Sequence, residues 1–191
     1  MRLAILARHG ESAFSARGLV NGDPAAAGPL TARGEGEARR LGELLAGERI
    51  DLCVTTEFER TRQTAAVALA GRDVPRLVVP ELNDPHYGEF EGGPLNEYRA
   101  WARSHGSGEA PRGGESRQTI VARYGRGYRL VLERPEDTVL VVAHSLPIAY
   151  VLDEPRPRMP MVEHAAVHRL PAEALLAAVE RLAAWLAAPT W

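Results

Sequence analysis

The chain of 191 residues is poor in cysteine, and Cys53 is the only one. A single cysteine excludes a disulfide framework and a cysteine-rich metal site. Long hydrophobic runs are also missing, because no apolar stretch approaches the roughly 18 residues that span a bilayer. The first residues contain neither a basic region nor the small-residue cleavage site of a secretory signal. We therefore expect a cytoplasmic protein with no membrane partner.

Lysine is absent, so arginine carries the positive charge. The arginine fork suits phosphate or carboxylate recognition, although a coding bias towards Arg and Ala explains the same composition. The formal net charge of -2 at pH 7 gives no reason to expect a nucleic acid partner. With 45% hydrophobic and 25% charged residues, the composition is globular and excludes a disordered chain. We expect one domain over residues 1–191, burying roughly 70% of its unfolded surface.

Short apolar runs alternate along the chain with stretches of helical spacing. The apolar runs predict strands at residues 3–7, 50–54, 76–80, 138–142 and 161–170. The helical spacing predicts helices at 31–47, 57–70, 95–104, 115–133 and 171–188, with a short helix ending at 152. The turn-rich stretch 81–94 resembles no regular element. This alternation favours an α/β fold, a single-domain three-layer α/β/α sandwich with a mostly parallel sheet.

Two of the expected strands end at a histidine. The first apolar run is followed by Arg8-His9-Gly10, and the run 138–142 is followed closely by His144. Strand ends of a parallel sheet lie on one edge, where ligands bind, so the two histidines can meet there. Arg60 lies where the second strand passes into its helix, and free N–H groups at a helix start favour an anion. A neutral imidazole is a good nucleophile towards phosphorus, and a guanidinium neutralises phosphate through paired hydrogen bonds.

Five segments spread over about 140 residues carry a more specific pattern. They are Arg8-His9-Gly10-Glu11-Ser12; Leu30-Thr31-Ala32-Arg33-Gly34 with Ala38-Arg39-Arg40-Leu41-Gly42; Thr55 to Ala65; Leu82-Asn83-Asp84-Pro85-His86-Tyr87-Gly88 with Gly114-Glu115-Ser116; and Val141-Val142-Ala143-His144. In this order they resemble the histidine phosphatase superfamily, the phosphoglycerate mutase-like proteins.

The resemblance implies a role for each matching residue. His9 would attack phosphorus and become a phosphohistidine. Arg8, Arg60 and His144 would hold the phosphoryl oxygens, and Asp84 would act as general acid and base. The positions that would contact phosphate or substrate are Ser15, Asn21, Gly22, His86, Tyr87 and Ser145. The resemblance implies neither a metal nor a cofactor, because the protein itself supplies the cations.

Three of these positions depart from the family pattern. Asp84 stands where Glu is usual, Ser15 where Asn is usual, and Ser145 where Gly is usual. Glu81, three residues before Asp84, is the alternative acid. The chain lacks the length and the basic insert of the glycolytic mutases, which favours a metal-independent phosphomonoesterase. The alternatives are a phosphoglycerate-type phosphomutase and a catalytically weak phosphate-binding or interaction module.

Three other signals have simpler explanations. Cys53 and Arg60 are one residue too far apart for the Cys-x-x-x-x-x-Arg loop of cysteine phosphatases, so we expect a core cysteine. His164 and His168 have the spacing of a metal pair on a helix, but a strand is expected there, which disfavours a metal site. No Gly-x-x-x-x-Gly-Lys loop is present, which excludes nucleotide hydrolysis of the P-loop kind.

The predicted partner is a small-molecule phosphate ester, and no pattern indicates an oligomeric state. The loops between Gly88 and Gly114, which would select the substrate, contain no recognisable code. Three arginines in this region, Arg99, Arg103 and Arg112, hint at a further anionic group on the substrate.

Overall fold

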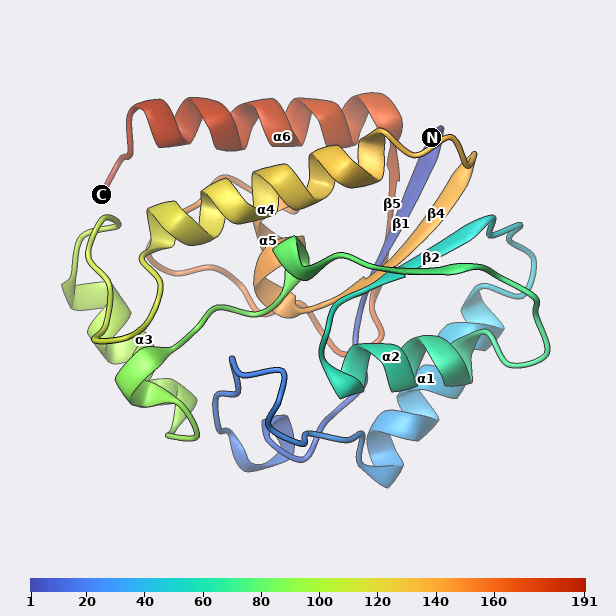
Figure 1. Ribbon diagram of the computed structural model, residues 1–191, viewed down its shortest axis with the longest axis horizontal. Helices are drawn as coiled ribbons and strands as arrows, with labels where there is room; N and C mark the ends of the chain where they lie inside the picture. Colours follow the sequence, from blue (N-terminus) through green and yellow to red (C-terminus); the bar gives the residue numbers. More distant parts are fainter.

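A five-stranded sheet crosses the computed structural model, which describes residues 1–191 (Figure 1). The strands are β1 (Leu3–Arg8), β2 (Leu52–Thr55), β3 (Arg76–Val78), β4 (Thr138–Ala143) and β5 (Val167–Pro171). They lie in the order β3-β2-β4-β1-β5, and all neighbours are parallel except β1 and β5. The sheet is therefore mostly parallel, as the sequence predicts.

Helices cover both faces of this sheet. They are α1 (Ala32–Leu44), α2 (Glu59–Ala68), α3 (Leu95–Ser104), α4 (Arg117–Leu132), α5 (Ser145–Leu152) and α6 (Ala172–Ala187). Three short 3-10 helices are η1 (Ser15–Arg17), η2 (Pro80–Leu82) and η3 (Gly88–Phe90). None of the helices combines the length and the apolar character needed to cross a membrane.

The alternation of side chains along β1 divides the core into two layers. Ala4 and Leu6 pack with residues of α4, α5 and α6, whereas Ile5 and Ala7 pack with residues of α1 and α2. Figure 1 shows α4 and α6 running side by side, with α1 and α2 at the other side of the strands. The predicted three-layer α/β/α sandwich is confirmed. The helix α3 lies apart from both layers and packs through Tyr98 against the loops after β1 and η2.

Several boundaries differ from those predicted. The last strand begins at Val167 instead of 161, because polar contacts bind the preceding segment to the strand ends. The stretch 81–94, expected without regular structure, contains most of η2 and all of η3. Helix α1 ends at Leu44, before Gly47, and Leu44 is exposed. Ala66 of α2 is exposed as well.

The register of β1 against β4 positions the two histidines. The pairing runs from Leu3 opposite Thr138 to Arg8 opposite Ala143, so His9 and His144 follow neighbouring strand ends. The backbone N–H of His9 still donates to the carbonyl of Ala143, at 2.9 Å. The hydrophobic register of two central strands therefore fixes the distance between the two imidazoles.

The start of α1 packs against the chain just after His9. Thr31 caps the helix by accepting a hydrogen bond from the Gly34 N–H at 3.1 Å, and its hydroxyl donates to the Glu11 carboxylate at 2.8 Å. A Cβ atom added at Gly34 would lie 2.0 Å from the Glu11 carbonyl oxygen. Glycine at this position therefore allows the helix and the loop to make contact.

We predict opposite effects for two glycines of α1. Gly34→Ala should lower the free energy of unfolding by about 1–3 kcal/mol, because backbone must shift to admit the methyl group. Gly36→Ala should raise it by about 1 kcal/mol, because Gly36 is exposed and nothing lies within 4 Å of its added Cβ. Urea unfolding of both variants checks this, and equal effects would contradict the packing described.

Candidate functional site

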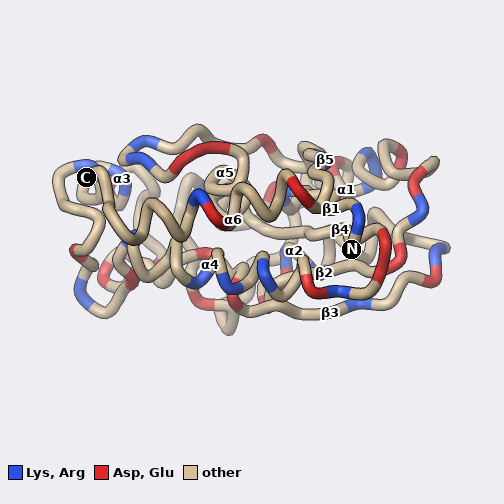
Figure 2. The backbone as a smooth tube through the Cα atoms, turned by 90° about the horizontal axis from the view of Figure 1, so that it is seen from above, with Lys and Arg blue, Asp and Glu red and all other residues tan.

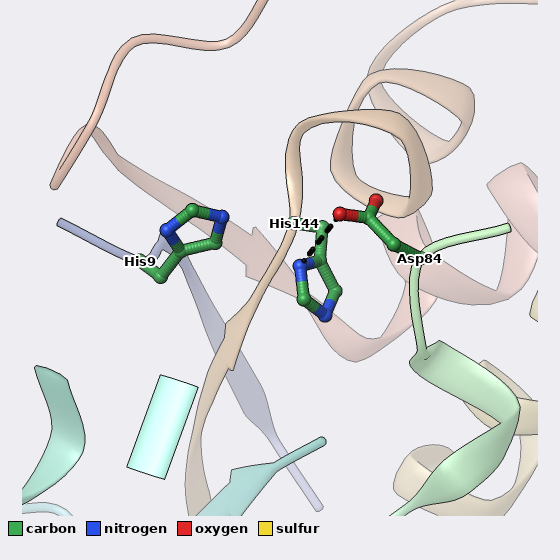
Figure 3. A group of neighbouring side chains, drawn as sticks. All are labelled: His9, Asp84 and His144. Atoms are coloured by element: carbon green, nitrogen blue, oxygen red, sulfur yellow. Dashed lines mark ion pairs between the residues drawn. The ribbon is translucent and has the colours of Figure 1, made fainter. Parts of the chain in front are cut away.

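Four chain segments meet beyond the carboxyl ends of β1, β2 and β4. His9 follows β1, His144 follows β4, Arg60 lies in the first turn of α2, and Asp84 follows η2. His9 and Arg60 are each 3% exposed, and His144 is fully buried. The ring centroids of His9 and His144 lie 5.3 Å apart in an edge-on arrangement (Figure 3). The structure therefore brings together the residues that the sequence places far apart.

The hydrogen bonds of His9 fix the position of its proton. Nδ1 lies 2.7 Å from the carbonyl oxygen of Gly10, which can only accept, so Nδ1 carries the proton. Nε2 is therefore unprotonated, and its lone pair accepts a hydrogen bond from Nε of Arg60 at 3.2 Å. Burial, followed by the positive charge of Arg60, lowers the pKa of His9 well below its ordinary value. His9 is thus neutral at pH 7, with a nucleophilic nitrogen at the site.

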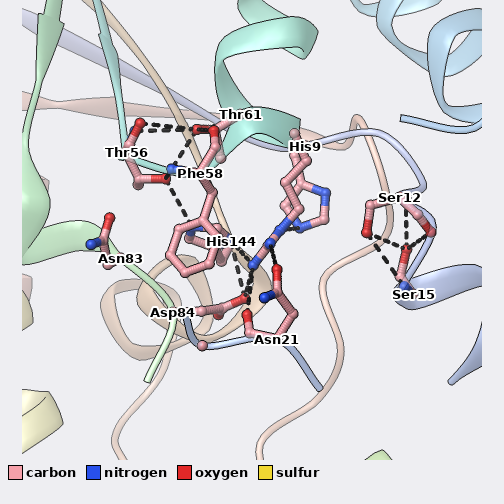
Figure 4. Close-up of polar contacts among 12 residues, drawn as sticks. His9, Ser12, Ser15, Asn21, Thr56, Phe58, Thr61, Asn83, Asp84 and His144 are labelled. Atoms are coloured by element: carbon pink, nitrogen blue, oxygen red, sulfur yellow. Dashed lines mark hydrogen bonds and ion pairs between the residues drawn. The ribbon is translucent and has the colours of Figure 1, made fainter. Parts of the chain in front are cut away.

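Arg60 donates from every nitrogen of its guanidinium, to His9, Asn21 and Asp84. Figure 4 shows these three residues gathered around one place. Nη1 donates to Oδ1 of Asn21 at 2.6 Å, and Nη2 donates to Oδ2 of Asp84 at 2.8 Å. The guanidinium carbon lies 4.0 Å from the centre of the Phe58 ring. These contacts therefore hold the Arg60 side chain in a single orientation.

Arg8 supplies a second buried guanidinium at the end of β1. Its Nη1 donates to the carbonyl of Val162 at 2.6 Å, and its buried Nε has no hydrogen-bond partner. Burial lowers the pKa of Arg8 to about 10, so it remains charged at pH 7. A buried donor without a partner is costly, so an anion that accepts a hydrogen bond from it would be favoured.

His144 and Asp84 form a coupled pair. Nδ1 of His144 lies 3.1 Å from Oδ2 of Asp84, and its Nε2 lies 2.9 Å from the Thr56 hydroxyl. Burial lowers the pKa of His144 to about 4, although Asp84 opposes this shift. Burial also disfavours the charged form of Asp84, but His144 and Arg60 outweigh it and hold the pKa of this carboxyl well below its usual range. The carboxylate is therefore ionised at pH 7.

The charges of the site favour an anion over a metal ion. His9, Asp84 and His144 have potential ligand atoms within 4.8 Å of one another, which is close enough for a metal site. Arg60, however, contacts all three, at 3.2, 2.8 and 3.3 Å, so its guanidinium occupies the space between them. With Arg8 and Arg60 charged, both histidines neutral and one carboxylate ionised, a bound cation would face net positive charge.

The site opens into a cavity of about 650 Å³. Four residues that the sequence predicts as substrate contacts line it, namely Ser15, Asn21, Tyr87 and Ser145. Ser145, where the family pattern has Gly, accepts a hydrogen bond from the Val162 N–H at 2.9 Å. The departure from the pattern therefore helps to hold the segment before β5.

Two predicted contact residues and the alternative acid lie outside this cavity. His86 is exposed, and its backbone N–H donates to Glu115 at 2.9 Å. A Cβ added at Gly22 would lie 2.0 Å from the Pro85 carbonyl oxygen, so Gly22 lets the loop after β1 approach the residue that follows Asp84. Glu81 packs against Gly127 of α4, away from His9.

His164 lies at the site, although the sequence suggested it only as half of a metal pair. Its ring centroid is 5.7 Å from that of His9, its buried Nε2 has no partner, and it lines the cavity. Burial lowers the pKa of His164 to about 4. His168 lies on β5 opposite Leu6, outside the group of potential metal ligands. No pattern in the sequence places His164 beside His9, because the contact depends on the path of the segment before β5.

Thr56 and Thr64 also support the site without having been singled out from the sequence. Thr56 contacts His144 as described, and the Thr64 hydroxyl accepts a hydrogen bond from the Gly10 N–H at 3.0 Å. Cys53 is buried in β2, and burial raises the pKa of its thiol to about 12. It is the core cysteine that the sequence predicts.

We predict that His144 makes stability depend on pH. Its folded pKa of about 4 lies below the unfolded value, so the unfolded chain takes up the proton first as pH falls. The stability that His144 contributes as a neutral residue is therefore present above the unfolded pKa and is lost on acidification. Its loss lowers the free energy of unfolding by roughly 2 kcal/mol between pH 7 and 5. Urea unfolding at the two pH values should show that the free energy of unfolding falls less for His144→Gln than for His86→Gln, the control at an exposed position. Identical losses would contradict the burial of a neutral His144.

Three comparisons place this geometry among known proteins. A model of the histidine phosphatase superfamily (branch 1) matches residues 4–182. The adenosylcobalamin/alpha-ribazole phosphatase of Salmonella typhimurium is 35% identical over 163 residues, covering 78% of this chain and 79% of that protein. A 2,3-bisphosphoglycerate-dependent phosphoglycerate mutase of Methylobacterium sp. is 36% identical over 163 residues, covering 75% and 76%.

Solved structures of related proteins have the same fold. A putative alpha-ribazole-5'-P phosphatase from Escherichia coli superposes with a TM-score of 0.69 at 32% identity, covering 79% of this chain and 77% of that one. YhfR from Bacillus stearothermophilus superposes with a TM-score of 0.76 at 26% identity, covering 87% and 89%. The resemblance seen in the sequence motifs is confirmed, as is the expected enzyme class, a phosphoric monoester hydrolase of the histidine phosphatase type. The chain belongs to the histidine phosphatase superfamily, branch 1.

Proposed function

We propose that this chain is a metal-independent phosphomonoesterase that acts through a phosphohistidine on His9, with residues 1–191 as one catalytic domain. One observation carries the proposal: the neutral imidazole of His9 has its proton on Nδ1 and its Nε2 directed at the Arg60 guanidinium. An unprotonated nitrogen beside a buried positive charge is suited to attack a phosphoryl group that the same charge binds.

In the first step the phosphoryl group binds among Arg8, Arg60 and His144. Its oxygens take over the hydrogen bonds that Asp84 now accepts from Arg60 and His144. Asp84 then loses the partners that keep its pKa low and faces a second negative charge, so it takes up a proton. Nε2 of His9 forms a bond to phosphorus, the bond to the ester oxygen breaks, and Asp84 donates its proton to that oxygen.

The second step transfers the phosphoryl group to water. Asp84, again ionised, accepts a proton from a water molecule as the water oxygen bonds to phosphorus. The bond between phosphorus and Nε2 breaks, which restores neutral His9 and releases phosphate. Arg8 and Arg60 balance the charge on the phosphoryl oxygens in both steps, so we propose no metal and no cofactor.

The proposed substrate is a small-molecule phosphate ester. The relatives named as adenosylcobalamin/alpha-ribazole phosphatase and as phosphoglycerate mutase support this class.

The mutase relative, 36% identical, makes a phosphomutase the second candidate. The two functions differ in the acceptor: a phosphatase passes the phosphoryl group to water, and a mutase returns it to the substrate. Release of inorganic phosphate in the presence of 3-phosphoglycerate and a priming diphosphate separates them. The location of the protein in the cytoplasm stays a prediction.

We predict that wild-type protein hydrolyses p-nitrophenyl phosphate in the presence of EDTA and that His9→Ala abolishes this turnover. The reason is that His9 supplies the nucleophile and no other group at the site replaces Nε2. An alkaline quench followed by mass spectrometry should detect the phosphorylated protein in the wild type alone. His168→Gln, on the edge strand β5, is the matched control and should retain turnover. Turnover by His9→Ala at the wild-type rate would refute the proposal.

We predict that Asp84→Asn slows hydrolysis most for substrates with poor leaving groups. General acid catalysis contributes roughly 10²–10⁴ in rate and matters most when the departing oxygen is strongly basic. An alkyl phosphate should therefore lose far more rate than p-nitrophenyl phosphate. The comparison variant is Glu81→Gln, because Glu81 lies outside the cavity. If Glu81→Gln produces the leaving-group effect instead, Asp84 is not the acid.

A further inference from the structure

A second group of arginines lines the cavity beyond the two that face the phosphoryl position. We call this group the arginine wall: Arg99 and Arg103 of α3, Arg117 at the start of α4, and Arg158 in the connection after α5. Figure 2 shows blue arginine stretches gathered around α3, at the end of the molecule away from β1. Asp84 is the only carboxylate among the lining residues, and it is already bound to Arg60.

None of the four arginines forms an ion pair, whereas eight other arginines of the chain pair with a carboxylate. Arg99 contacts only the Met161 sulfur, at 3.4 Å. Arg117 donates to the Tyr150 hydroxyl at 3.3 Å and to the Pro157 carbonyl at 3.4 Å. None of these three contacts neutralises a positive charge, so the charge of the arginine wall remains uncompensated.

Two carboxylates on neighbouring elements are engaged elsewhere. Glu115, next to the start of α4, binds Arg123 at 2.7 Å. Asp153, after α5, binds Arg156 at 2.5 Å. Like charges around one cavity repel one another and destabilise the folded state, unless a ligand of opposite charge is bound. The phosphoryl group does not fulfil this need, because Arg8 and Arg60 already balance its charge.

Apolar side chains line the same cavity. They include Leu95 and Tyr98 of α3, and Met159 and Met161 of the connection before β5. Apolar side chains of this kind bind the uncharged body of a ligand, while a few polar groups fix its ends. The cavity thus combines two groups of arginines with an apolar lining.

We propose that the arginine wall binds a second anionic group, a phosphate or a carboxylate, at the far end of the substrate. This rests on the proposed phosphatase function and extends it. The substrate is then a phosphate monoester whose apolar body separates the reacting phosphate from another anion. The guanidinium fork suits either oxyanion, and it supplies binding energy to the whole substrate away from the reacting bond.

The test compares substrates with the same leaving group. Hexyl phosphate has no second anion, 6-(phosphonooxy)hexanoate carries a carboxylate, and 1,6-hexanediol bisphosphate carries a phosphate. The measured quantity is the ratio of kcat/KM for each compound with two anionic groups to kcat/KM for hexyl phosphate. We expect a ratio above one for 6-(phosphonooxy)hexanoate and above about two for the bisphosphate, because its two equivalent phosphates double kcat/KM by themselves. After division of the bisphosphate ratio by this factor, the larger ratio identifies the preferred second group.

The test variant is Arg99→Gln/Arg103→Gln, which removes two charges from α3 while keeping good helix formers. Its ratio should fall by roughly tenfold or more, mainly through KM, because charge-assisted hydrogen bonds to the bound substrate are lost. The control is Arg126→Gln/Arg129→Gln, which removes the same charge from the exposed face of α4. The control should keep the wild-type ratio, which separates a local site from the general field of the protein.

Two results would overturn the arginine wall as a binding site. One is a wild-type ratio near one for 6-(phosphonooxy)hexanoate and near two for the bisphosphate, and the other is an equal fall in the test and control variants. If the wild type hydrolyses neither these compounds nor p-nitrophenyl phosphate, the proposed function fails separately. Calorimetric binding of 1,6-hexanediol bisphosphate and hexyl phosphate then decides: tighter bisphosphate binding that Arg99→Gln/Arg103→Gln abolishes supports the wall, and equal affinities overturn it.

Discussion

The contact between the Arg60 guanidinium and Nε2 of His9 is the interaction on which the rest of the site depends. A buried cation beside an imidazole keeps that imidazole neutral, and here it donates to the unprotonated nitrogen of the ring. The same guanidinium holds Asn21 and Asp84, so one side chain links the loop after β1 with the loop after η2. Its own orientation comes from α2, from the Phe58 ring, and from the near-complete burial of the side chain.

The fold supplies this arrangement through its central strands. The register of β1 and β4 places the two histidines side by side, and α1 packs through Gly34 on the loop just after His9. Asp84 accepts from donors that a phosphoryl group would need, so in the proposed reaction substrate binding and proton uptake by Asp84 are coupled. In that proposal the ionised carboxylate becomes an acid only when substrate is bound.

Much of the architecture and the central site could be predicted from the sequence. Apolar runs that stop at His9 and His144 indicate strand ends on one edge, and ordered motifs place Arg60 and Asp84 with them. The position of His164 could not be predicted, because it depends on tertiary contacts of Arg8 and Ser145 with the segment before β5. For the same reason local patterns did not reveal that His86 points away from the cavity: adjacency along the chain does not determine side-chain direction.

The central claim, a neutral His9 with its proton on Nδ1, can be measured directly in the ligand-free protein. Long-range ¹H–¹⁵N NMR spectra of histidine-labelled protein at pH 6 report the protonation of each ring nitrogen. The account predicts that Nδ1 of His9 has the shift of a protonated nitrogen and Nε2 that of an unprotonated one. An imidazolium spectrum, or a proton on Nε2 instead, would contradict the account.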